Sequence, residues 1–372
     1  NMDILDQITA EDIKAASPPP DMRRGRGSVS NISGRFERLA HERMDDGWQT
    51  PCEENNRRTT VTLEKAKVIL TRNSSPDLPF DRSINPYRGC EHGCSYCYAR
   101  PTHSYQGLSP GLDFESRLFA KPEAASLLAK ELGKKNYEVA PIALGTNTDP
   151  YQPIEKDYKI TRSLLDLLDK CSHPVTIVTK NHMVVRDIDI LERMAKRGLV
   201  KVDLSVTTLD PKLSRIMEPR ASTPQKRLDA LKQLHGAGIP TGVLLAPVIP
   251  AINDHEIENI LTACALMGVG EAYYIPIKLP NEVAPLFTAW LEEHFPDRAA
   301  RVLSRIRSWR GGRLNNPRFG MRNIASGVDG LMLARRFRVT IECLGLNKEP
   351  LRLNCNQFVP PFNNAGGQLA LF

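Results

Sequence analysis

The stretch Val175–Val206, VTIVTKNHMVVRDIDILERMAKRGLVKVDLSV, indicates the fold class of this chain. It begins with a nearly continuous apolar run, Val175–Thr179, and ends with a second one, Val202–Val206. Between the two runs, Asp187–Arg197 carries apolar residues at helical spacing. Continuous apolar runs are typical of parallel strands that are buried on both faces. A strand, a helix and a strand in succession therefore predict a unit of parallel α/β structure.

The same alternation extends from about Ser83 to Leu279. Further apolar runs predict the strands Pro141–Thr146, Thr241–Ala246 and Ala272–Ile277, and further periodic segments predict the helices Pro122–Lys135, Ile160–Lys170, Thr223–His235 and Asp254–Met267. The pattern alone predicts a parallel α/β barrel or a doubly wound sheet. In both architectures the chemistry lies at the carboxyl ends of the strands, so the residues directly after each run are candidates for the site.

The composition of the 372 residues is that of an ordinary folded protein, with 41% hydrophobic, 25% charged and 6% aromatic residues. It excludes a collagenous, coiled-coil or mostly disordered chain. The longest uncharged stretch, Gly236–Asn253, is interrupted by three prolines, and the first residues lack the features of a secretory signal. We therefore expect a cytoplasmic protein without a membrane span. Eight cysteines are too few for a disulfide scaffold, so a tight cysteine cluster would indicate a metal site.

Such a cluster occurs at Cys90, Cys94 and Cys97, within the sequence NPYRGCEHGCSYCY. Three thiolates on one short loop can bind three irons of a 4Fe-4S cluster and leave the fourth iron without a protein ligand. An iron without a protein ligand is open for chemistry. The alternative is a structural zinc site, which takes four protein ligands and would need His92, His103 or a distant cysteine as the fourth.

The spacing Cys-x3-Cys-x2-Cys, with the aromatic Tyr96 directly before the last cysteine, resembles the signature of the radical S-adenosylmethionine (SAM) superfamily. The resemblance covers about Ser83–Leu279 and implies an α/β fold with a partial (β/α)6 TIM-type barrel. It implies two cofactors, a 4Fe-4S cluster and S-adenosylmethionine, and an electron donor such as flavodoxin or ferredoxin. In that superfamily the reduced cluster cleaves the cofactor, and the resulting 5′-deoxyadenosyl radical removes a hydrogen atom from the substrate, while the protein supplies orientation and excludes water.

The loops after the predicted strands carry the candidate cofactor-binding residues, which are Thr146, Thr148, Asp149, Lys180, Ser205, Thr207 and Arg220. Asp149 and the hydroxyls beside it suit the methionyl ammonium, and Lys180 suits the carboxylate or the ribose. The guanidinium of Arg220 matches a carboxylate. Each residue taken alone is more often a cap or a surface group, but four successive loops carry suitable groups.

Within the superfamily, the string DPYQPIE at Asp149–Glu155 and the pair Tyr96 and Tyr98 resemble the branch related to DNA repair photolyases of the spore photoproduct lyase type. The known enzyme of that branch splits a methylene-bridged thymine dimer with a cysteine as hydrogen donor and tyrosines nearby. The resemblance implies damaged DNA as the partner, with the pyrimidine lesion flipped out of the stack. It also implies that Tyr96 and Tyr98 are catalytic residues.

The donor cysteine of that branch has no counterpart here, because no cysteine lies between Cys97 and Cys171. Cys343 or Cys355 could fold back over the barrel, but a plain buried thiol is the commoner state of such a residue. Tyr98 is the preferred substitute. Two other functions remain open: radical modification of RNA or of a peptide, and an inactive iron-sulfur protein associated with DNA, against which the full set of cofactor-side residues argues.

The rest of the chain divides by composition. We expect an irregular N-terminal extension over residues 1–79, the radical SAM core over 80–280, an arginine-rich and mainly helical region over 281–360 and a flexible tail over 361–372. The third of these regions has eleven arginines between residues 298 and 338, with no lysine and one acid.

A helix predicted over Arg298–Arg310 places Arg298, Arg301 and Arg305 on one face, opposite an apolar stripe. Guanidinium groups bind phosphate oxygens bidentately, so these three arginines are candidate DNA contacts. The alternative is a solvated helix face.

The tail ends in Gln368, Leu369, Ala370, Leu371 and Phe372. This ending resembles the short Gln-Leu-x-Leu-Phe peptides with which bacterial repair and replication proteins bind the DNA polymerase sliding clamp. The resemblance implies that Gln368, Leu369, Leu371 and Phe372 bind the clamp. The alternative is that the last apolar side chains pack on this protein's own surface.

Overall fold

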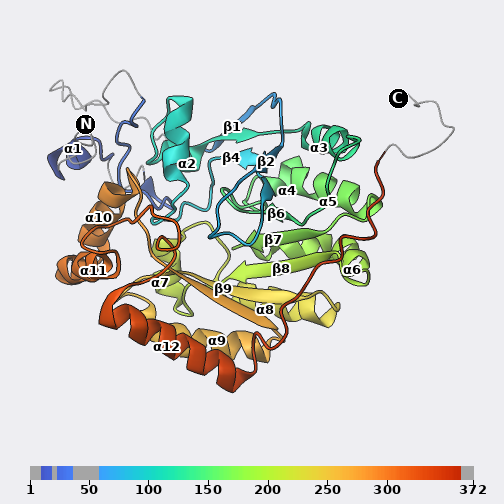
Figure 1. Cartoon of the computed structure of the whole chain (residues 1–372). Helices are drawn as coiled ribbons and strands as arrows, with labels where there is room; N and C mark the ends of the chain where they lie inside the picture. Colours follow the sequence, from blue (N-terminus) through green and yellow to red (C-terminus); the bar gives the residue numbers. More distant parts are fainter. Residues whose placement is uncertain (1–9, 19–22, 37–57, 362–372) are drawn as a thin grey trace.

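The computed structural model describes residues 10–18, 23–36 and 58–361 (Figure 1). Its main sheet has the order β10-β9-β8-β7-β6-β3-β2. The strands are β2 (Leu70–Arg72), β3 (Arg82–Ile84), β6 (Ile142–Leu144), β7 (Val175–Thr179), β8 (Val200–Ser205), β9 (Thr241–Val248) and β10 (Glu271–Pro276). All neighbours pair in parallel except β2 with β3. The six parallel strands from β10 to β3, together with the antiparallel β2, form an open barrel whose edges are β10 and β2. This confirms the predicted partial (β/α)6 fold.

The helices between the strands also follow the predicted periodicity. They are α3 (Ala124–Leu132), α4 (Glu155–Tyr158), α5 (Ile160–Lys170), α6 (Ile188–Ala195), α7 (Pro211–Met217), α8 (Pro224–Gly236) and α9 (Ile257–Leu266). Helix α8 illustrates why they begin where they do: Pro224 occupies its first turn, and the Thr223 side chain accepts a hydrogen bond from the Lys226 N–H. The apolar faces of these helices pack on the strands, as in the fully buried Leu164, Ile177 and Leu231.

Strand β6 is shorter than the predicted run Pro141–Thr146 because the chain bends at Gly145. This glycine has a φ of +90°, and a Cβ there would lie 2.1 Å from the carbonyl oxygen of Val178. Only glycine fits such a close approach to the neighbouring strand. The bend turns residues 146–149 across the carboxyl end of the sheet.

The described residues before position 80 contain regular elements, where the sequence predicts an irregular extension. These residues contribute α1 (Ala10–Ala15), β1 (Thr60–Leu63) and strand β2 of the main sheet. A second sheet of order β1-β5-β4 joins β1 to β5 (Arg117–Ala120) and β4 (Tyr87–Arg88). Because β2 belongs to the main sheet, the folded body begins before residue 80, and the other domain limits stay a proposal.

The C-terminal region contains α10 (Val283–His294), α11 (Pro296–Trp309) and α12 (Gly327–Leu344), followed by an extended segment, residues 345–361. In Figure 1 this segment runs in dark red from α12 past the sheet. It closes the amino end of the sheet, because Asn347 N–H bonds Gly270 O (3.0 Å), Asn354 N–H bonds Gly198 O (2.8 Å) and Val359 N–H bonds Cys171 O (2.8 Å). The opposite end, formed by the carboxyl ends of the strands, is termed the mouth.

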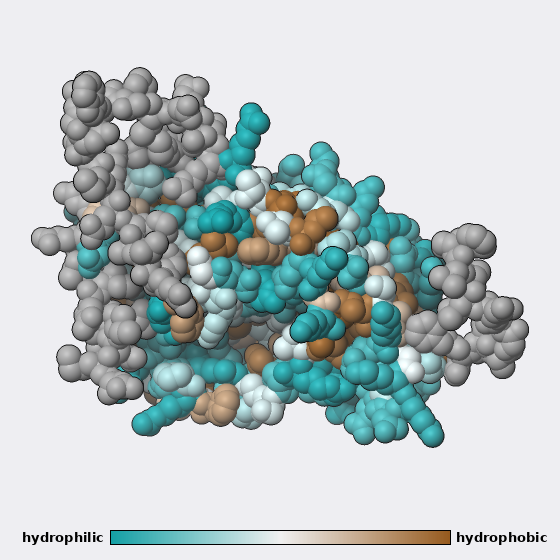
Figure 2. Space-filling model, turned by 90° about the horizontal axis from the view of Figure 1, so that it is seen from above, coloured by the Kyte–Doolittle hydropathy of each residue, from teal (hydrophilic) through white to brown (hydrophobic). Residues whose placement is uncertain are grey.

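The surface seen from above is mostly hydrophilic, with small apolar patches (Figure 2). No helix in the described ranges has the length and apolar character needed to cross a membrane. The predicted tail, with Gln368 and its neighbours, lies outside the described residues.

Candidate active site at the carboxyl end of the sheet

The cysteine loop, residues 89–98, follows β4 and is fixed by backbone hydrogen bonds. Cys90 N–H bonds Phe114 O (2.9 Å), and Ser95 N–H bonds Met217 O (3.0 Å). Gly93 has a φ of +67°, and a Cβ on it would lie 2.6 Å from a carboxylate oxygen of Glu115. The loop is therefore held against two distant segments, and its turn requires glycine.

A buried carboxylate supports this loop from below. Glu115 forms an ion pair with Arg100, and neither side chain is exposed to solvent. The same carboxylate accepts the backbone N–H groups of Gly27 (2.9 Å) and Ser28 (2.8 Å), while Arg100 donates to Cys94 O (2.8 Å). The N-terminal segment is thus tied to the cysteine loop through one acid.

The string Asp149–Glu155 holds the loop from the sheet side. The Gln152 amide donates to Gly89 O (3.1 Å) and accepts from Glu91 N–H (3.0 Å). Glu155 accepts hydrogen bonds from Tyr87 and Thr161. These side chains therefore position the cysteines.

The three thiols lie close enough to interact, and they form no disulfide. Burial raises the pKa of each, and the neighbouring carboxylates and thiols add to the effect for Cys90 and Cys94. A bound iron reverses this shift, because a coordinating thiol is deprotonated outright.

The number of these donors fits a cluster better than zinc. A structural zinc ion takes four protein ligands, so the three cysteines would need a fourth. In a 4Fe-4S cluster each thiolate binds a different iron, so three cysteines and no fourth ligand fit it.

Asp149 is already saturated by protein groups. Its oxygens accept the Thr179 hydroxyl (2.7 Å), Lys180 N–H (2.7 Å) and Tyr151 N–H (2.8 Å), and His92 Nδ1 lies 3.3 Å away. Burial acts to raise the pKa of Asp149, but His92 and these hydrogen bonds hold it below its usual value. Asp149 therefore joins the cysteine loop to the end of β7, and it has little capacity left for the methionyl ammonium.

Tyr96 belongs to a second buried network, centred on Glu218. The Tyr96 hydroxyl donates to Glu218, Thr207 donates to it (3.0 Å), and Arg227 and Lys180 (3.7 Å) pair with it. Burial alone would raise the pKa of Glu218, but the two cations lower it to about 2. A hydroxyl committed to a permanent carboxylate orients the loop, so this contact supports a positioning role for Tyr96.

Tyr98 is exposed at the mouth, in contrast to Tyr96. Its side chain is 48% exposed, and its hydroxyl donates to the Thr146 carbonyl. Lys278, directly after β10, places its ammonium 4.9 Å from the centre of the Tyr98 ring. Burial, with help from Arg322 and Arg310, lowers the pKa of Lys278 to about 8.

The remaining predicted residues occupy two places. Thr148 and Ser205 are buried at strand ends, and the Lys180 ammonium reaches across the mouth to Ala246 O (3.2 Å) at the end of β9. Arg220 lies elsewhere, paired with Glu91 on the side of the N-terminal segment. Lys180 and Thr207 thus meet at Glu218, Thr146 lies beside Tyr98, and Arg220 pairs with Glu91 instead.

Sequence reasoning missed four residues that complete the site. Asn85 accepts the N–H groups of Asn147 (3.0 Å) and Thr148 (3.4 Å), and Glu218, Arg227 and Lys278 make the contacts given above. Lys278 directly follows the predicted strand Ala272–Ile277 and could have been found there, whereas Glu218 follows helix α7 and no strand end marks it. Arg227 is on α8, where no motif marks it.

The described cysteines outside the loop are far from the mouth. Cys171 and Cys355 lie at the amino end of the sheet, beside the hydrogen bonds of Val359 and Asn354. Cys264 is buried in α9, and Cys343 is exposed near the end of α12. The suggestion that Cys343 or Cys355 folds over the mouth is therefore wrong, because Cys343 lies in α12 just before the segment that closes the opposite end, and Cys355 lies within that segment.

The predicted DNA-contacting arginines differ from one another. Arg298 and Arg301 are exposed on α11. Arg305 instead faces Asp254 (3.7 Å) and Asp329 (3.4 Å), which holds α11 against α12. The predicted common face therefore offers two free guanidinium groups, because the third is used inside the protein.

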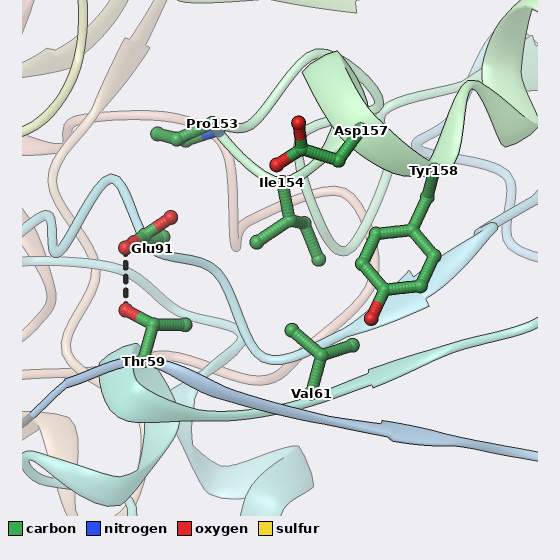
Figure 3. A pocket seen from close by; sticks show the side chains of 7 residues that line it. All are labelled: Thr59, Val61, Glu91, Pro153, Ile154, Asp157 and Tyr158. Carbon is green, nitrogen blue, oxygen red and sulfur yellow. Dashed lines mark hydrogen bonds between the residues drawn. The ribbon is translucent and has the colours of Figure 1, made fainter.

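A cavity of about 560 Å³ lies beside the cysteine loop (Figure 3). Its walls are Thr59, Val61, Glu91, Pro153, Ile154, Asp157 and Tyr158. Glu91 is bound by Thr59, as the figure shows, and by Arg220. Two carboxylates in its lining make this cavity a poor place for a phosphate, so it does not compete with the mouth as a nucleic-acid site.

Comparison with known proteins finds relatives of this chain. A model of the radical SAM superfamily matches residues 84–264. An uncharacterized protein of Mycobacterium tuberculosis is 34% identical over 246 residues, which is 65% of this chain and 72% of the relative. A protein named radical SAM Nalpha-GlyT isomerase, from Pseudomonas phage M6, is 24% identical over 57% of this chain and 43% of its own length.

Among solved structures, spore photoproduct lyase in complex with dinucleoside spore photoproduct has a TM-score of 0.56 at 17% identity, covering 78% of this chain and 81% of that chain. This likeness shows the fold alone. By its sequence matches the chain belongs to the radical SAM superfamily. Its cofactors are a 4Fe-4S cluster and S-adenosylmethionine, and members of the family require an electron donor.

Proposed function

We propose that the protein is a radical SAM lyase that reverses a pyrimidine photoproduct, of the thymine type, in DNA. The observation that carries the proposal is the position of the arginine-rich helix α11 at the barrel mouth. Its apolar face packs on Ile249 and Ile252 after β9 and on Ile277 after β10. In Figure 1 the β8 arrowhead points to the side that carries α10 and α11. Arg298 and Arg301 are thus candidate phosphate contacts beside the mouth.

Two further observations support a lesion in DNA as the substrate. The chain shares its fold with spore photoproduct lyase over most of its length, and that enzyme has been solved with a dinucleoside photoproduct. A base inside a duplex is stacked and paired, so its reacting carbon could not reach the cofactor at the strand ends. The lesion must therefore leave the stack, at a cost of a few kcal/mol that is smallest for damaged bases.

In this proposal the chain's own residues divide the work. When bound, the cofactors supply the radical chemistry. Cys90, Cys94 and Cys97 hold the cluster, and Lys180 and Thr207 bind the polar groups of the cofactor from the strand ends. Tyr98, half exposed at the mouth, is the candidate substitute for the missing donor cysteine.

The decisive experiment is anaerobic incubation of the reconstituted protein with S-adenosylmethionine and ultraviolet-irradiated DNA. We expect 5′-deoxyadenosine to form and intact thymine to be restored, and we expect both only when the added DNA has been irradiated. Cofactor cleavage without any thymine restored from a full set of photoproducts would reject the lyase and leave the radical SAM activity standing.

A second candidate is a radical isomerase or modifying enzyme that acts on a nucleic acid. It is favoured by the absence of a cysteine between Cys97 and Cys171 and by the isomerase name of the phage relative. Mass spectrometry of nucleosides from the same incubation distinguishes the two, because an isomerised product keeps its mass and changes its retention.

Two partners complete the proposal. A low-potential protein such as flavodoxin or ferredoxin would supply the electron. The ending QLALF would bind the sliding clamp at an affinity on the order of micromolar, because few residues are ordered on binding. The last described segment leaves the body beside Cys171, at the amino end of the sheet, so a clamp-bound tail would leave the mouth free.

The clamp proposal is tested by calorimetry with a peptide of residues 366–372. A peptide with Leu371→Ala and Phe372→Ala is the control. Binding by the native peptide alone supports the proposal, and no heat from the native peptide at a concentration well above micromolar rejects it.

A further inference from the structure

The loop between α11 and α12, residues 311–326, is called the rim loop here. Its base is fixed to the end of β10. The buried Arg310 donates to Arg322 O (2.6 Å) and Ile324 O (3.3 Å) of the loop and to Ile277 O (2.7 Å) of the strand end. Leu279 N–H also bonds Leu314 O (3.2 Å). One buried guanidinium therefore sets the position of the loop relative to the mouth.

The tip of the rim loop is fixed to the other edge of the open sheet. Asp77, in the connection between β2 and β3, accepts the Gly320 N–H (2.6 Å) and pairs with Arg322 (2.7 Å). Because β10 and β2 are the two edges of the sheet, the loop crosses the gap between these edges, from the carboxyl end of β10 to the connection at the amino end of β3. It is held at both ends by charged contacts.

This fixed loop exposes large apolar side chains. Phe319 is 63% exposed, Met321 41% and Ile324 54%. The Arg322 guanidinium lies 5.1 Å from the centre of the Phe319 ring and supports it from one side. Exposure of large apolar side chains to water is unfavourable unless a partner covers them. Their arrangement on a fixed loop therefore indicates a binding surface.

The charge around these side chains identifies the partner. Arg313 and Arg318 flank them and are exposed. Between residues 298 and 341 the one acid is Asp329, and it faces Arg305. Apolar side chains within a field of arginines fit a nucleic-acid duplex, whose phosphates pair with the cations while its unstacked bases cover the apolar groups.

The rim loop also contacts the mouth itself. Asn323 accepts a hydrogen bond from the Lys278 ammonium (3.3 Å), and the same ammonium lies over the ring of Tyr98. Tyr98 follows Cys97 directly. A strand opened by the loop would therefore be next to the site where the chemistry occurs.

We infer that the rim loop is a wedge for duplex DNA: Phe319 and Met321 enter the base stack next to the target, and Arg313 and Arg318 hold the backbone. This inference rests on the proposed function, because it names the part of the protein that would move a base from the stack to the mouth. Side chains inserted between base steps unstack them at a cost of a few kcal/mol, which the new contacts offset.

The test uses the anaerobically purified full chain and a short DNA duplex with 2-aminopurine next to a T·T mismatch. We expect binding of the unaltered protein to raise the 2-aminopurine fluorescence, because the fluorophore loses its stacking. In the double variant Phe319→Ala, Met321→Ala the increase should vanish. Its duplex affinity should fall about tenfold, the loss of one stacked base, while its affinity for the single strand stays nearly unchanged.

The control variant is Leu266→Ala, which removes an even more exposed apolar side chain (76%) at the end of α9, on the amino side of the sheet. It should behave like the unaltered protein. Thermal melting of each variant verifies folding. A variant that carries Phe319→Trp in place of Phe319→Ala should regain the increase in 2-aminopurine fluorescence. If the double variant keeps both fluorescence and affinity, or if the bound unaltered protein never brightens the probe, the wedge is wrong and the lyase proposal stands. If the unaltered protein binds neither duplex nor single strand, both fail.

Discussion

The cysteine loop and the arginine-rich surface use charge in opposite ways. Around the loop, Glu115 and Glu218 are fully buried and each is paired with an arginine. On α11 and the rim loop, Arg298, Arg301 and Arg318 are exposed. Buried pairs are costly to break, whereas exposed charges are free to meet a partner. The comparison separates the buried residues that build the site from the exposed residues that could bring substrate to it.

The largest effect is expected from the cysteines themselves. Cys90→Ala, Cys94→Ala or Cys97→Ala should abolish reductive cleavage of S-adenosylmethionine, because each removes the ligand of one iron. Iron content and 5′-deoxyadenosine are measured together. The matched control is Cys171→Ala, a buried cysteine in the core, which should keep both. Full activity of protein that carries zinc and no iron would contradict the assignment.

The support beneath the loop comes next. Glu115→Ala leaves Arg100 buried without a counter-charge, so the free energy of unfolding should fall by about 3–5 kcal/mol. The control is Glu192→Ala, which breaks the exposed Glu192–Lys196 pair (2.8 Å) and should cost about 1 kcal/mol or less. Urea unfolding of both variants measures the difference. Equal losses would show that burial of the Glu115 pair does not matter.

The lowered pKa of Glu218 predicts how the stability of the folded protein depends on pH. The pKa of Glu218 is about 2 in the folded protein against 4.5 for an unperturbed glutamate, so the folded state holds the proton less tightly. The stabilisation is complete above pH 4.5 and is lost as the pH falls toward 2, with a magnitude on the order of 3 kcal/mol.

The variant Glu218→Gln should be less stable than the unaltered protein at neutral pH and should lack this dependence. Urea unfolding between pH 6 and 3 compares the slopes of the two proteins. Parallel curves would mean that another group dominates the acid response.

The smallest effect concerns the exposed arginines. Arg298→Ala with Arg301→Ala should reduce the slope of log affinity against log salt for duplex DNA by about two, because each phosphate contact contributes roughly 0.9. Arg305→Ala should leave the slope unchanged, because Arg305 already faces two carboxylates. Fluorescence anisotropy at several salt concentrations decides. An unchanged slope in the double variant would assign this helix face to solvent.

Much of the fold could be predicted because its signals are local. The strand Val175–Thr179 and the helix Ile160–Lys170 have the predicted limits, since a continuous apolar run and a periodic segment each determine their own structure. The sequence predicts a mainly helical region over residues 281–360, but it does not predict α10 and α12 as separate helices. Helix α12 exposes Val328 and Leu331, so its apolar residues do not form a single stripe.

The site was predictable as a set of positions but less so as a set of roles. The loop after β6 was expected to bind the cofactor through Asp149, yet the hydrogen bonds of this carboxylate are taken by the end of β7. Likewise Arg305 shares a helix face with Arg301 but finds acids on two other elements. Partners far away in the sequence decide which polar side chains are free, and no local pattern reveals them.

The buried partners of the cysteine loop have a consequence for biosynthesis. Arg227, which pairs with Glu218 beneath Tyr96, lies 130 positions after Cys97. At a synthesis rate of about 5–20 residues per second, the three thiols leave the ribosome roughly ten seconds before Arg227, which packs behind them, has been synthesised. During that interval they are accessible to oxygen and to iron-delivery proteins alike. The order of translation therefore gives the cell a defined period in which the cluster can be installed before the pocket closes around it.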